Sequence, residues 1–184
     1  MAVTLVTGGA GYIGSHTCVE LLGAGQDVVV VDDLSNASYE AVRRIEEIGG
    51  KRLAAFVEGD VRDRSVLARI FAEYEVKAVI HFAAKKAVGE SVSLPLAYYD
   101  NNLQGLLSVL QAMDAAECRR MVFSSSATVY GDPASVPIRE DFPTTATNPY
   151  GWTKLMGEQI LRDLAASDAR WNVVLLRYFN PVGA

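Results

Sequence analysis

Tyr150 and Lys154 are the residues whose types and spacing most directly suggest chemistry. They lie four positions apart, downstream of the serine run Ser124–Ser126. On a helix this spacing places the phenol and the ammonium on one face, with Cβ atoms about 5–6 Å apart. A nearby ammonium favours phenolate over phenol, so it lowers the pKa of a tyrosine and makes it a usable base. Because this spacing is common by chance, the pair indicates an active site only if the chain also supplies a cofactor.

A glycine-rich turn near the amino terminus predicts that cofactor site. Gly8, Gly11 and Gly14 follow an apolar segment expected to be a strand and open a segment of helical character. Glycines at this spacing permit a tight turn and a close approach of the backbone to a pyrophosphate. The helix amino terminus offers unpaired N–H groups to the phosphates. With a nicotinamide dinucleotide bound there, a tyrosine base would belong to an enzyme that moves a hydride.

Two carboxylates indicate which dinucleotide is bound. Asp32 ends the second expected strand, close to the ~20 residues after the glycines at which a carboxylate binds the ribose 2′-hydroxyl. Asp33 adds a second negative charge beside it. Both would repel a 2′-phosphate, so the sequence predicts NAD rather than NADP.

The elements that must position these residues alternate along the chain. Short β-branched runs are separated by segments of helical period, which is the pattern of βαβ units. The expected strands are Ala2–Thr7, Asp27–Asp32, Leu53–Glu58, Ala78–Phe82, Met121–Ser125 and Asn172–Arg177. The expected helices are Ile13–Leu22, Ser38–Ile48, Ser65–Glu73, Leu94–Ala116 and Tyr150–Ala166. We therefore predict one α/β domain over residues 1–184, a Rossmann-like doubly wound parallel sheet with helices on both faces.

The segment Gly131–Pro149 contains four prolines and predicts a long loop. Loops of this length inside a compact domain are usually functional or mobile. Since it directly precedes Tyr150, it is a candidate wall of the active site.

Composition excludes several classes of protein. Half of the 184 residues are hydrophobic and 21% are charged, as in an ordinary globular domain, and the net charge of −5 disfavours a nucleic-acid partner. Cys18 and Cys118 form no metal or disulfide pattern and are expected to pack as small apolar side chains. No secretory signal or membrane-spanning run is evident, and no metal site is predicted. We expect a cytoplasmic protein without membrane contact.

Three polar residues each have a structural alternative. Asp60 could bound an adenine pocket or cap a helix, and Ser126 could be a catalytic hydroxyl or cap the turn after its strand. His81 lies within an apolar strand and is expected to be a hydrogen-bonded core residue rather than a catalytic one.

The chain resembles the extended short-chain dehydrogenase/reductase superfamily, and within it most the UDP-glucose 4-epimerases. The stretches that carry the resemblance are TGGAGYIGSHTCVELL, FVEGDVRD, VIHFAAKKAVGESV, YYDNN, FSSSATVYGD, the Tyr150–Lys154 motif and LRYFNPVGA. They run along the whole chain but correspond only to the cofactor-binding part of that family. We therefore expect an amino-terminal portion that lacks the family's substrate-closing carboxy-terminal domain.

The resemblance implies roles for individual residues. Tyr150 is the expected base, Lys154 its electrostatic partner and a ribose ligand, and Ser126 the catalytic hydroxyl. The residues expected to bind NAD, beside Tyr150 and Lys154, are Gly8, Gly11, Tyr12, Ile13, Gly14, Asp32, Asp33, Asn36, Asp60, Val61, Phe82, Ala83, Lys86, Asn101 and Phe179. The residues expected to contact the UDP-sugar are Ser126, Tyr150 and Asn180. Asp33, Ala37 and Ala84 depart from the residues frequent in the family, but none belongs to the catalytic trio.

The reaction implied is epimerisation of a UDP-hexose at carbon 4. Tyr150 takes the proton of the sugar 4-hydroxyl, directly or through Ser126, a hydride moves to NAD, and a transient 4-keto sugar is reduced from its other face. Dehydratases of the superfamily carry an acidic pair after the catalytic hydroxyl, where this chain has Ala127 and Thr128. Another nucleotide-sugar epimerase or a decarboxylase remains an alternative, as does an NAD-binding module without turnover.

The resemblance also implies assembly. The two long expected helices, Leu94–Ala116 and Tyr150–Ala166, are similar to those that form a four-helix dimer interface in the family. We therefore expect a homodimer.

Overall fold

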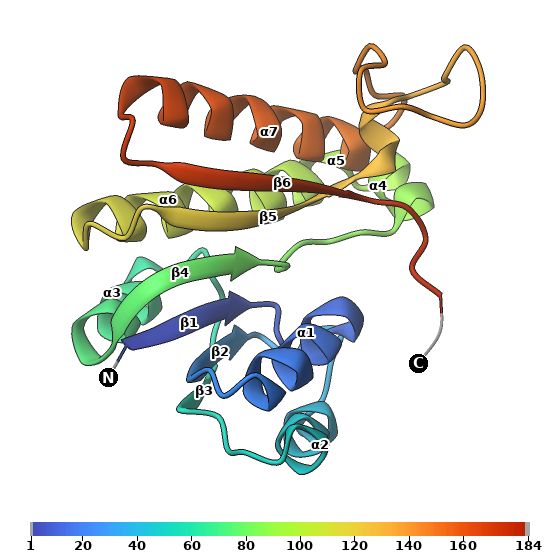
Figure 1. Cartoon of the computed structure of the whole chain (residues 1–184). Helices are drawn as coiled ribbons and strands as arrows, with labels where there is room; N and C mark the ends of the chain where they lie inside the picture. Colours follow the sequence, from blue (N-terminus) through green and yellow to red (C-terminus); the bar gives the residue numbers. More distant parts are fainter. Residues whose placement is uncertain (1, 183–184) are drawn as a thin grey trace.

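The computed structural model describes residues 2–182, and its centre is a sheet of six parallel strands (Figure 1). The strands are β1 (Ala2–Thr7), β2 (Val28–Asp32), β3 (Ala55–Glu58), β4 (Glu75–His81), β5 (Arg120–Ser126) and β6 (Asn172–Tyr178). Their order in the sheet is β3-β2-β1-β4-β5-β6. This is the order of a doubly wound dinucleotide-binding fold, so the predicted fold class is confirmed.

Helices connect consecutive strands. They are α1 (Tyr12–Gly23), α2 (Tyr39–Gly49), α3 (Arg64–Glu73), α4 (Val88–Ser93), α5 (Pro95–Tyr99), α6 (Gly105–Ala115) and α7 (Pro149–Ser167), with a π-helical segment at Asp100–Gln104 and a short 3-10 helix at Ala127–Val129. Within residues 2–182, no helix is both long and apolar enough to cross a membrane.

Two expectations about the helices need correction. The helix expected over Leu94–Ala116 is three segments, because Asp100–Gln104 forms a π-turn between α5 and α6. The short helix α4 was not predicted, since its glycine and two serines give no clear helical period. The remaining expected strands and helices are present, with ends displaced by up to a few residues, and β4 begins earlier than expected, at Glu75.

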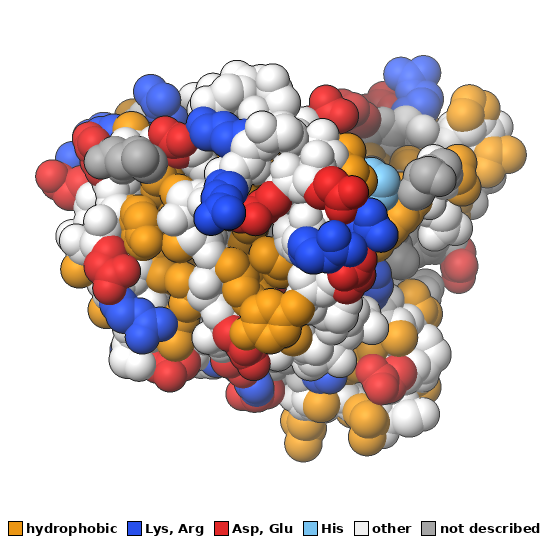
Figure 2. Space-filling view, turned by 90° about the horizontal axis from the view of Figure 1, so that it is seen from below, with side chains coloured by type: hydrophobic (Ala, Val, Ile, Leu, Met, Phe, Trp, Pro, Cys, Tyr) orange, Lys and Arg blue, Asp and Glu red, His pale blue; other side chains and the backbone are white. Residues whose placement is uncertain are grey.

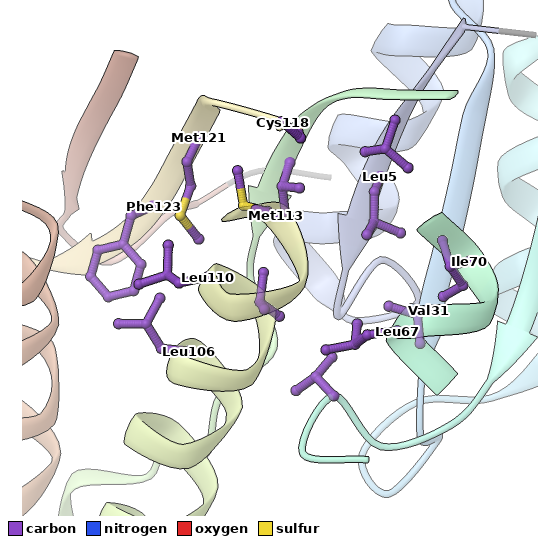
Figure 3. Packing of buried hydrophobic residues seen from close by; sticks show 14 of the residues in the cluster. Leu5, Val31, Leu67, Ile70, Leu106, Leu110, Met113, Cys118, Met121 and Phe123 are labelled. Atoms are coloured by element: carbon purple, nitrogen blue, oxygen red, sulfur yellow. The ribbon is translucent and has the colours of Figure 1, made fainter. Parts of the chain in front are cut away.

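The alternating side chains of the central strands build two cores on opposite faces of the sheet. Val29 and Val31 of β2 pack in the core that holds α3, α6 and α7, whereas Val28 and Val30 pack in the core that holds α1 and α2. Figure 3 shows the larger core, where Leu106, Leu110 and Met113 of α6 lie near the side chains of β5. The fully apolar sequence of β2 is thus explained by its burial on both faces. Cys18 and Cys118 are buried free thiols in these cores, as predicted.

The sheet is not covered equally on both faces at β6. Val173 and Leu175 pack against the core beneath α7, whereas Val174 and Leu176 are 44% and 38% exposed. Helices therefore lie on both faces of the sheet as a whole, while one face of β6 keeps apolar side chains at the surface.

The segment between Gly131 and Asn148 is a loop without a regular element, as predicted, except for a single bridge between Tyr130 and Thr145. Pro149, expected as its last residue, is instead the first residue of α7, where its missing N–H leaves no helical hydrogen bond unmade.

Candidate active site

The predicted site residues line one cleft of about 1020 Å³ at the carboxyl ends of the strands. This edge is where ligands bind in open parallel sheets. The predicted residues that line it are Gly8, Gly11, Tyr12, Ile13, Gly14, Asp32, Asp33, Asn36, Asp60, Val61, Phe82, Ala83, Lys86, Asn101, Ser126, Tyr150, Lys154, Phe179 and Asn180. Residues far apart in the chain therefore meet in a single place.

The glycine loop leaves no room for side chains. Gly8 has φ +68°, and a Cβ there would lie 2.6 Å from the backbone nitrogen of Ala83. A Cβ at Gly14 would lie 2.3 Å from the carbonyl oxygen of Gly8. Gly11 directly precedes the first residue of α1. The glycines therefore bring the β1–α1 turn against the end of β4 and expose the amino terminus of α1 to the cleft, a cradle of the shape and polarity that a pyrophosphate requires.

Asp32 holds the loops on both sides of the cofactor edge. One carboxylate oxygen accepts the N–H of Ala10 at 3.0 Å and the other accepts that of Leu34 at 2.9 Å. Burial raises the pKa of this carboxyl, while the backbone hydrogen bonds lower it. Asp33 accepts both the N–H and the hydroxyl of Ser35. Each carboxylate oxygen has a further lone pair, so Asp32 can still accept a ribose hydroxyl from the cleft.

Asp60 is not a helix cap. Asp63 caps α3 by accepting the N–H of Ser65, whereas Asp60 pairs with Arg62, whose guanidinium lies 2.6 Å away and lowers the pKa of that carboxyl. The capping alternative for Asp60 is therefore wrong, and its carboxylate lines the cleft beside Val61.

Tyr150 and Lys154 both lie on α7 and face the cleft, with the Lys154 ammonium 5.9 Å from the centre of the Tyr150 ring. The phenol pKa is shifted in the direction opposite to that predicted. Burial raises the pKa of Tyr150, and a hydrogen bond from Ser126 offsets this only in part. The prediction considered the adjacent charge alone, whereas removal from water dominates in this environment.

The Lys154 ammonium is buried among apolar groups. It donates to the carbonyl oxygen of Ser124 at 2.6 Å and lies 5.0 Å from the centre of the Phe123 ring. Burial lowers the pKa of Lys154 to about 8. The pKa of the lysine is therefore well below its usual range, and its charge is costly to maintain until an anion or a phenolate lies beside it.

Ser126 is both a capping residue and a cleft residue. Its hydroxyl oxygen accepts the N–H of Thr128 at 3.2 Å and the Thr128 hydroxyl at 2.9 Å, which closes the 3-10 turn after β5. With both lone pairs of the oxygen engaged, the hydroxyl hydrogen is available for Tyr150 or a ligand. The capping alternative thus accompanies a role in the cleft rather than excluding it.

Sequence reasoning missed several residues that line the cleft. From the sequence, Thr128 served only as evidence that the acidic pair of dehydratases is missing, although its hydroxyl lines the cleft and donates to Ser126. Tyr98 of α5 is buried, donates to Glu90 at 2.7 Å and accepts the N–H of Ala87. Burial is the main cause that raises the pKa of Tyr98 to about 12. The partner of Thr128 lies only two residues before it, so a local serine–threonine contact could have indicated it. Tyr98 has no such signal, because its partners Ala87 and Glu90 lie at and within α4.

His81 is a core residue, as predicted. It is buried and its Nδ1 lies 2.7 Å from the hydroxyl of Thr7 on the neighbouring strand. Burial, and then the charge of Lys154, lower the pKa of His81 to about 3. It is therefore neutral at physiological pH and packs against Phe123.

Comparison with known proteins identifies the family. Residues 4–184 match the family described as "NAD dependent epimerase/dehydratase family". UDP-glucose 4-epimerase of Bacillus subtilis is 62% identical over 180 residues, which are 98% of this chain and 53% of that protein. The Dictyostelium discoideum enzyme is 58% identical over 98% of this chain and 52% of its own length. The chain spans about half the length of these curated relatives.

Solved structures agree with this assignment. UDP-glucose 4-epimerase from Bifidobacterium longum, in complex with NAD⁺ and UDP, has a TM-score of 0.97 at 53% identity and covers all of this chain and 55% of that one. The Stenotrophomonas maltophila enzyme, with bound NAD and formylated UDP-arabinopyranose, has a TM-score of 0.95 at 51% identity, over 99% of this chain and 54% of that one. The resemblance seen in the sequence motifs is confirmed, and the chain belongs to the NAD-dependent epimerase/dehydratase family.

Proposed function

We propose that this chain provides the NAD site and the catalytic groups for epimerisation of a UDP-hexose at carbon 4, interconverting UDP-glucose and UDP-galactose. The observation that carries the proposal is a single cleft that holds both the glycine loop and the Ser126–Tyr150–Lys154 set. Similarity to UDP-glucose 4-epimerases over 98% of the chain supports the same reaction.

The residues present fit NAD. A Cβ at Gly8 or Gly14 would clash with the neighbouring backbone, and the close packing of this loop leaves the amino terminus of α1 open to a pyrophosphate in the cleft. Asp32 keeps a lone pair for a ribose hydroxyl. The carboxylates of Asp32 and Asp33 favour NAD over its 2′-phosphorylated form. When bound, NAD would supply a hydride acceptor for carbon 4 that can return the hydride to either face of the resulting ketone.

Tyr150 is the proposed proton acceptor for the sugar 4-hydroxyl. Because Ser126 Oγ already accepts two hydrogen bonds from Thr128, it serves best as a donor to the reacting oxygen. We therefore favour direct proton transfer to Tyr150 over a relay through Ser126. Positive charge on Lys154, and on the nicotinamide when it is bound, favours the phenolate against the cost of burial.

Epimerisation is favoured over dehydration by the two residues after Ser126. Elimination of water requires an additional acid and base, whereas Ala127 and Thr128 do not titrate, and the Thr128 hydroxyl is engaged with Ser126.

We propose that the uridine nucleotide binds near Asn180, which lies at the cleft with Phe179. The alternative is a module that binds NAD without turnover.

Two measurements separate these possibilities. Mass spectrometry of nucleotide released from the purified protein, or titration with NAD, is expected to detect NAD and little NADP; absence of NAD binding would refute the proposal. Incubation with UDP-galactose is then expected to yield UDP-glucose, and NAD binding without conversion would favour the binding module.

Tyr150→Phe should lower turnover by at least about 100-fold while NAD binding persists.

We also propose that the chain forms a homodimer through α6 and α7. Leu107 on α6, and Trp152 and Met156 on α7, are each 38–39% exposed despite their apolar character. Light scattering is expected to give twice the mass of 19.9 kDa, and a Trp152→Glu variant should be monomeric. A monomeric parent at high concentration would refute the proposal.

We propose a cytoplasmic protein that binds neither nucleic acid nor membranes. The buried free thiols Cys18 and Cys118 support a reducing compartment. The net charge of −5 and the mixture of acidic and basic side chains on the face shown in Figure 2 provide no field that would attract a polyanion.

A further inference from the structure

Glu158 is a buried charge that the proposed chemistry does not use. It lies on α7, four residues after Lys154 and eight after Tyr150, so the three side chains share one face of the helix. Its side chain is 0% exposed. A carboxylate so removed from water is costly unless its lone pairs are filled. Its partners therefore show what it contributes.

Apart from Arg162 on α7 itself, the partners of Glu158 come from two neighbouring strands. Ser125 of β5 donates to Oε1 at 2.5 Å, and Arg177 of β6 donates to Oε1 at 2.9 Å and to Oε2 at 2.8 Å. Ser125 and Arg177 are directly paired in the parallel ladder. One carboxylate of α7 thus joins two adjacent strands at the same level, next to the strand end that carries Ser126.

The same network reaches the turn that follows Ser126. A third nitrogen of Arg177 donates to the hydroxyl of Tyr130 at 2.8 Å, and its guanidinium carbon lies 4.8 Å from the centre of that ring. Tyr130 directly follows the 3-10 turn Ala127–Val129 that Ser126 caps. Glu158 on α7 therefore contacts β5 and β6 directly and reaches the turn after Ser126 through Arg177.

This contact set permits only one position of α7 along β5. Sliding a helix by a single residue moves its side chains by about 1.5 Å and rotates them by about 100°. Such a movement would break bonds of 2.5–2.9 Å and leave the buried Glu158 carboxylate without its partners on the two strands. Apolar contacts alone tolerate small slips better, because dispersion has no direction.

We propose that Glu158, through Ser125 and Arg177, is the positioning residue that sets the register of α7 on β5 and so places Tyr150 and Lys154 against Ser126. The inference rests on the catalytic role proposed for these three residues. The depressed pKa of Glu158, lowered by Arg177 and Ser125 despite burial, agrees with a permanently charged anchor.

Hydrogen exchange by mass spectrometry on the whole chain, without added nucleotide, tests the register directly. Glu158→Gln keeps the shape but loses the charge, and is expected to accelerate exchange at least about tenfold in peptides covering 149–156 and 122–130, with β1 and β2 unchanged. Ser125→Ala, which removes one contact and leaves the ion pair, is expected to act at the same places more weakly. If Glu158→Gln does not fold, Ser125→Ala alone tests whether this network sets the register of α7.

Arg162→Gln is the matched control. Arg162 also contacts Glu158, at 2.8 Å, but its side chain is 44% exposed. Its loss should change exchange by less than about twofold. Uniform acceleration along the whole chain, or unchanged exchange over 149–156 in both Glu158→Gln and Ser125→Ala, would overturn the inference.

A second readout connects the register to chemistry. If the parent converts UDP-galactose, Ser125→Ala should lower kcat several-fold while KM stays within about twofold, because ground-state binding does not require the Tyr150–Ser126 alignment. A change in KM alone would count against positioning. A parent that neither binds NAD nor turns over would refute the proposed function, whereas the exchange experiment would still decide the role of Glu158.

Discussion

Gly14 shows how a single hydrogen in place of a methyl group creates a binding site. Gly14→Ala would place a Cβ 2.3 Å from the Gly8 carbonyl oxygen and 2.8 Å from Gly9 Cα, so the glycine loop must move. We expect a loss of about 1–3 kcal/mol in the free energy of unfolding and at least a tenfold loss in NAD affinity. Urea unfolding and calorimetric titration with NAD measure the two effects.

Gly23 is the control for that substitution, because it lies on the same helix and a Cβ there meets nothing within 4 Å. Gly23→Ala should leave NAD affinity unchanged and stabilise the fold by up to about 1 kcal/mol. Equal NAD affinity in Gly14→Ala and the parent would contradict the role assigned to the loop.

Lys154 should destabilise the nucleotide-free chain at neutral pH. Its pKa is about 8 in the folded protein and 10.5 in the reference state. Between these values the unfolded chain binds the proton and the folded chain does not, so stability rises with pH across this window. Below about pH 8 both states are protonated and the penalty of burial is fully present.

Lys154→Met removes this penalty. We expect the variant to be more stable than the parent at pH 7, by on the order of 2–3 kcal/mol, with the difference shrinking towards pH 10. Urea titrations of both proteins at pH 7 and pH 10 isolate the contribution of Lys154 to stability. The tyrosines titrate in both proteins, so their contribution cancels in the difference. A less stable variant at pH 7 would mean that the hydrogen bond to the Ser124 carbonyl outweighs desolvation.

Among the elements, the π-turn Asp100–Gln104 has the clearest structural purpose. It presents Asn102 to the loop after β4, where the amide donates to the Lys85 carbonyl and to the Thr153 hydroxyl and accepts the Lys85 N–H. π-turns are often associated with functional sites, and this one aligns the cleft wall with α7. The sequence predicted a single helix here because the helical spacing of apolar residues continues through the π-turn.

Asn102→Leu should reveal the contribution of this turn. It removes the partner of the Lys85 carbonyl, whereas the Lys85 N–H keeps a bond to Asn101 and the Thr153 hydroxyl keeps one to the Tyr150 carbonyl. We therefore expect a loss of about 1–3 kcal/mol in the free energy of unfolding. Gln104→Leu lies in the same turn and removes only a 3.3 Å contact with Ser108, so its cost should stay below about 1 kcal/mol. Chemical denaturation measures the free energy of unfolding of both variants. Similar losses in the two would refute the structural role assigned to Asn102.

In the whole molecule, the two leucines of β6 should differ sharply although they are adjacent. Leu175 packs into the core beneath α7, whereas Leu176 is 38% exposed on the other face of the sheet. We expect Leu175→Ala to cost about 2–3 kcal/mol and Leu176→Ala less than about 1 kcal/mol. Thermal unfolding of the two variants measures the difference, and a larger cost at Leu176 would show that its face is covered in solution.

Much of the fold and the site followed from local signals. The strand–glycine–helix sequence around Gly8, Gly11 and Gly14, and the carboxylate at Asp32, predicted the cofactor edge because turn geometry and phosphate contacts depend on neighbouring residues. The apolar run Val28–Val31 predicted a doubly buried strand. The spacing of Tyr150 and Lys154 predicted their shared helix face.

The sequence alone thus determined the class of fold, the cofactor edge and the side chains proposed to be catalytic, since these depend on local periodicity and residue chemistry. Only the tertiary structure decided the protonation behaviour of Tyr150 and Lys154 and the network at Glu158. Those properties depend on which groups exclude water and which distant segments supply partners. Desolvation and long-range hydrogen bonding have no signature in a run of neighbouring residues.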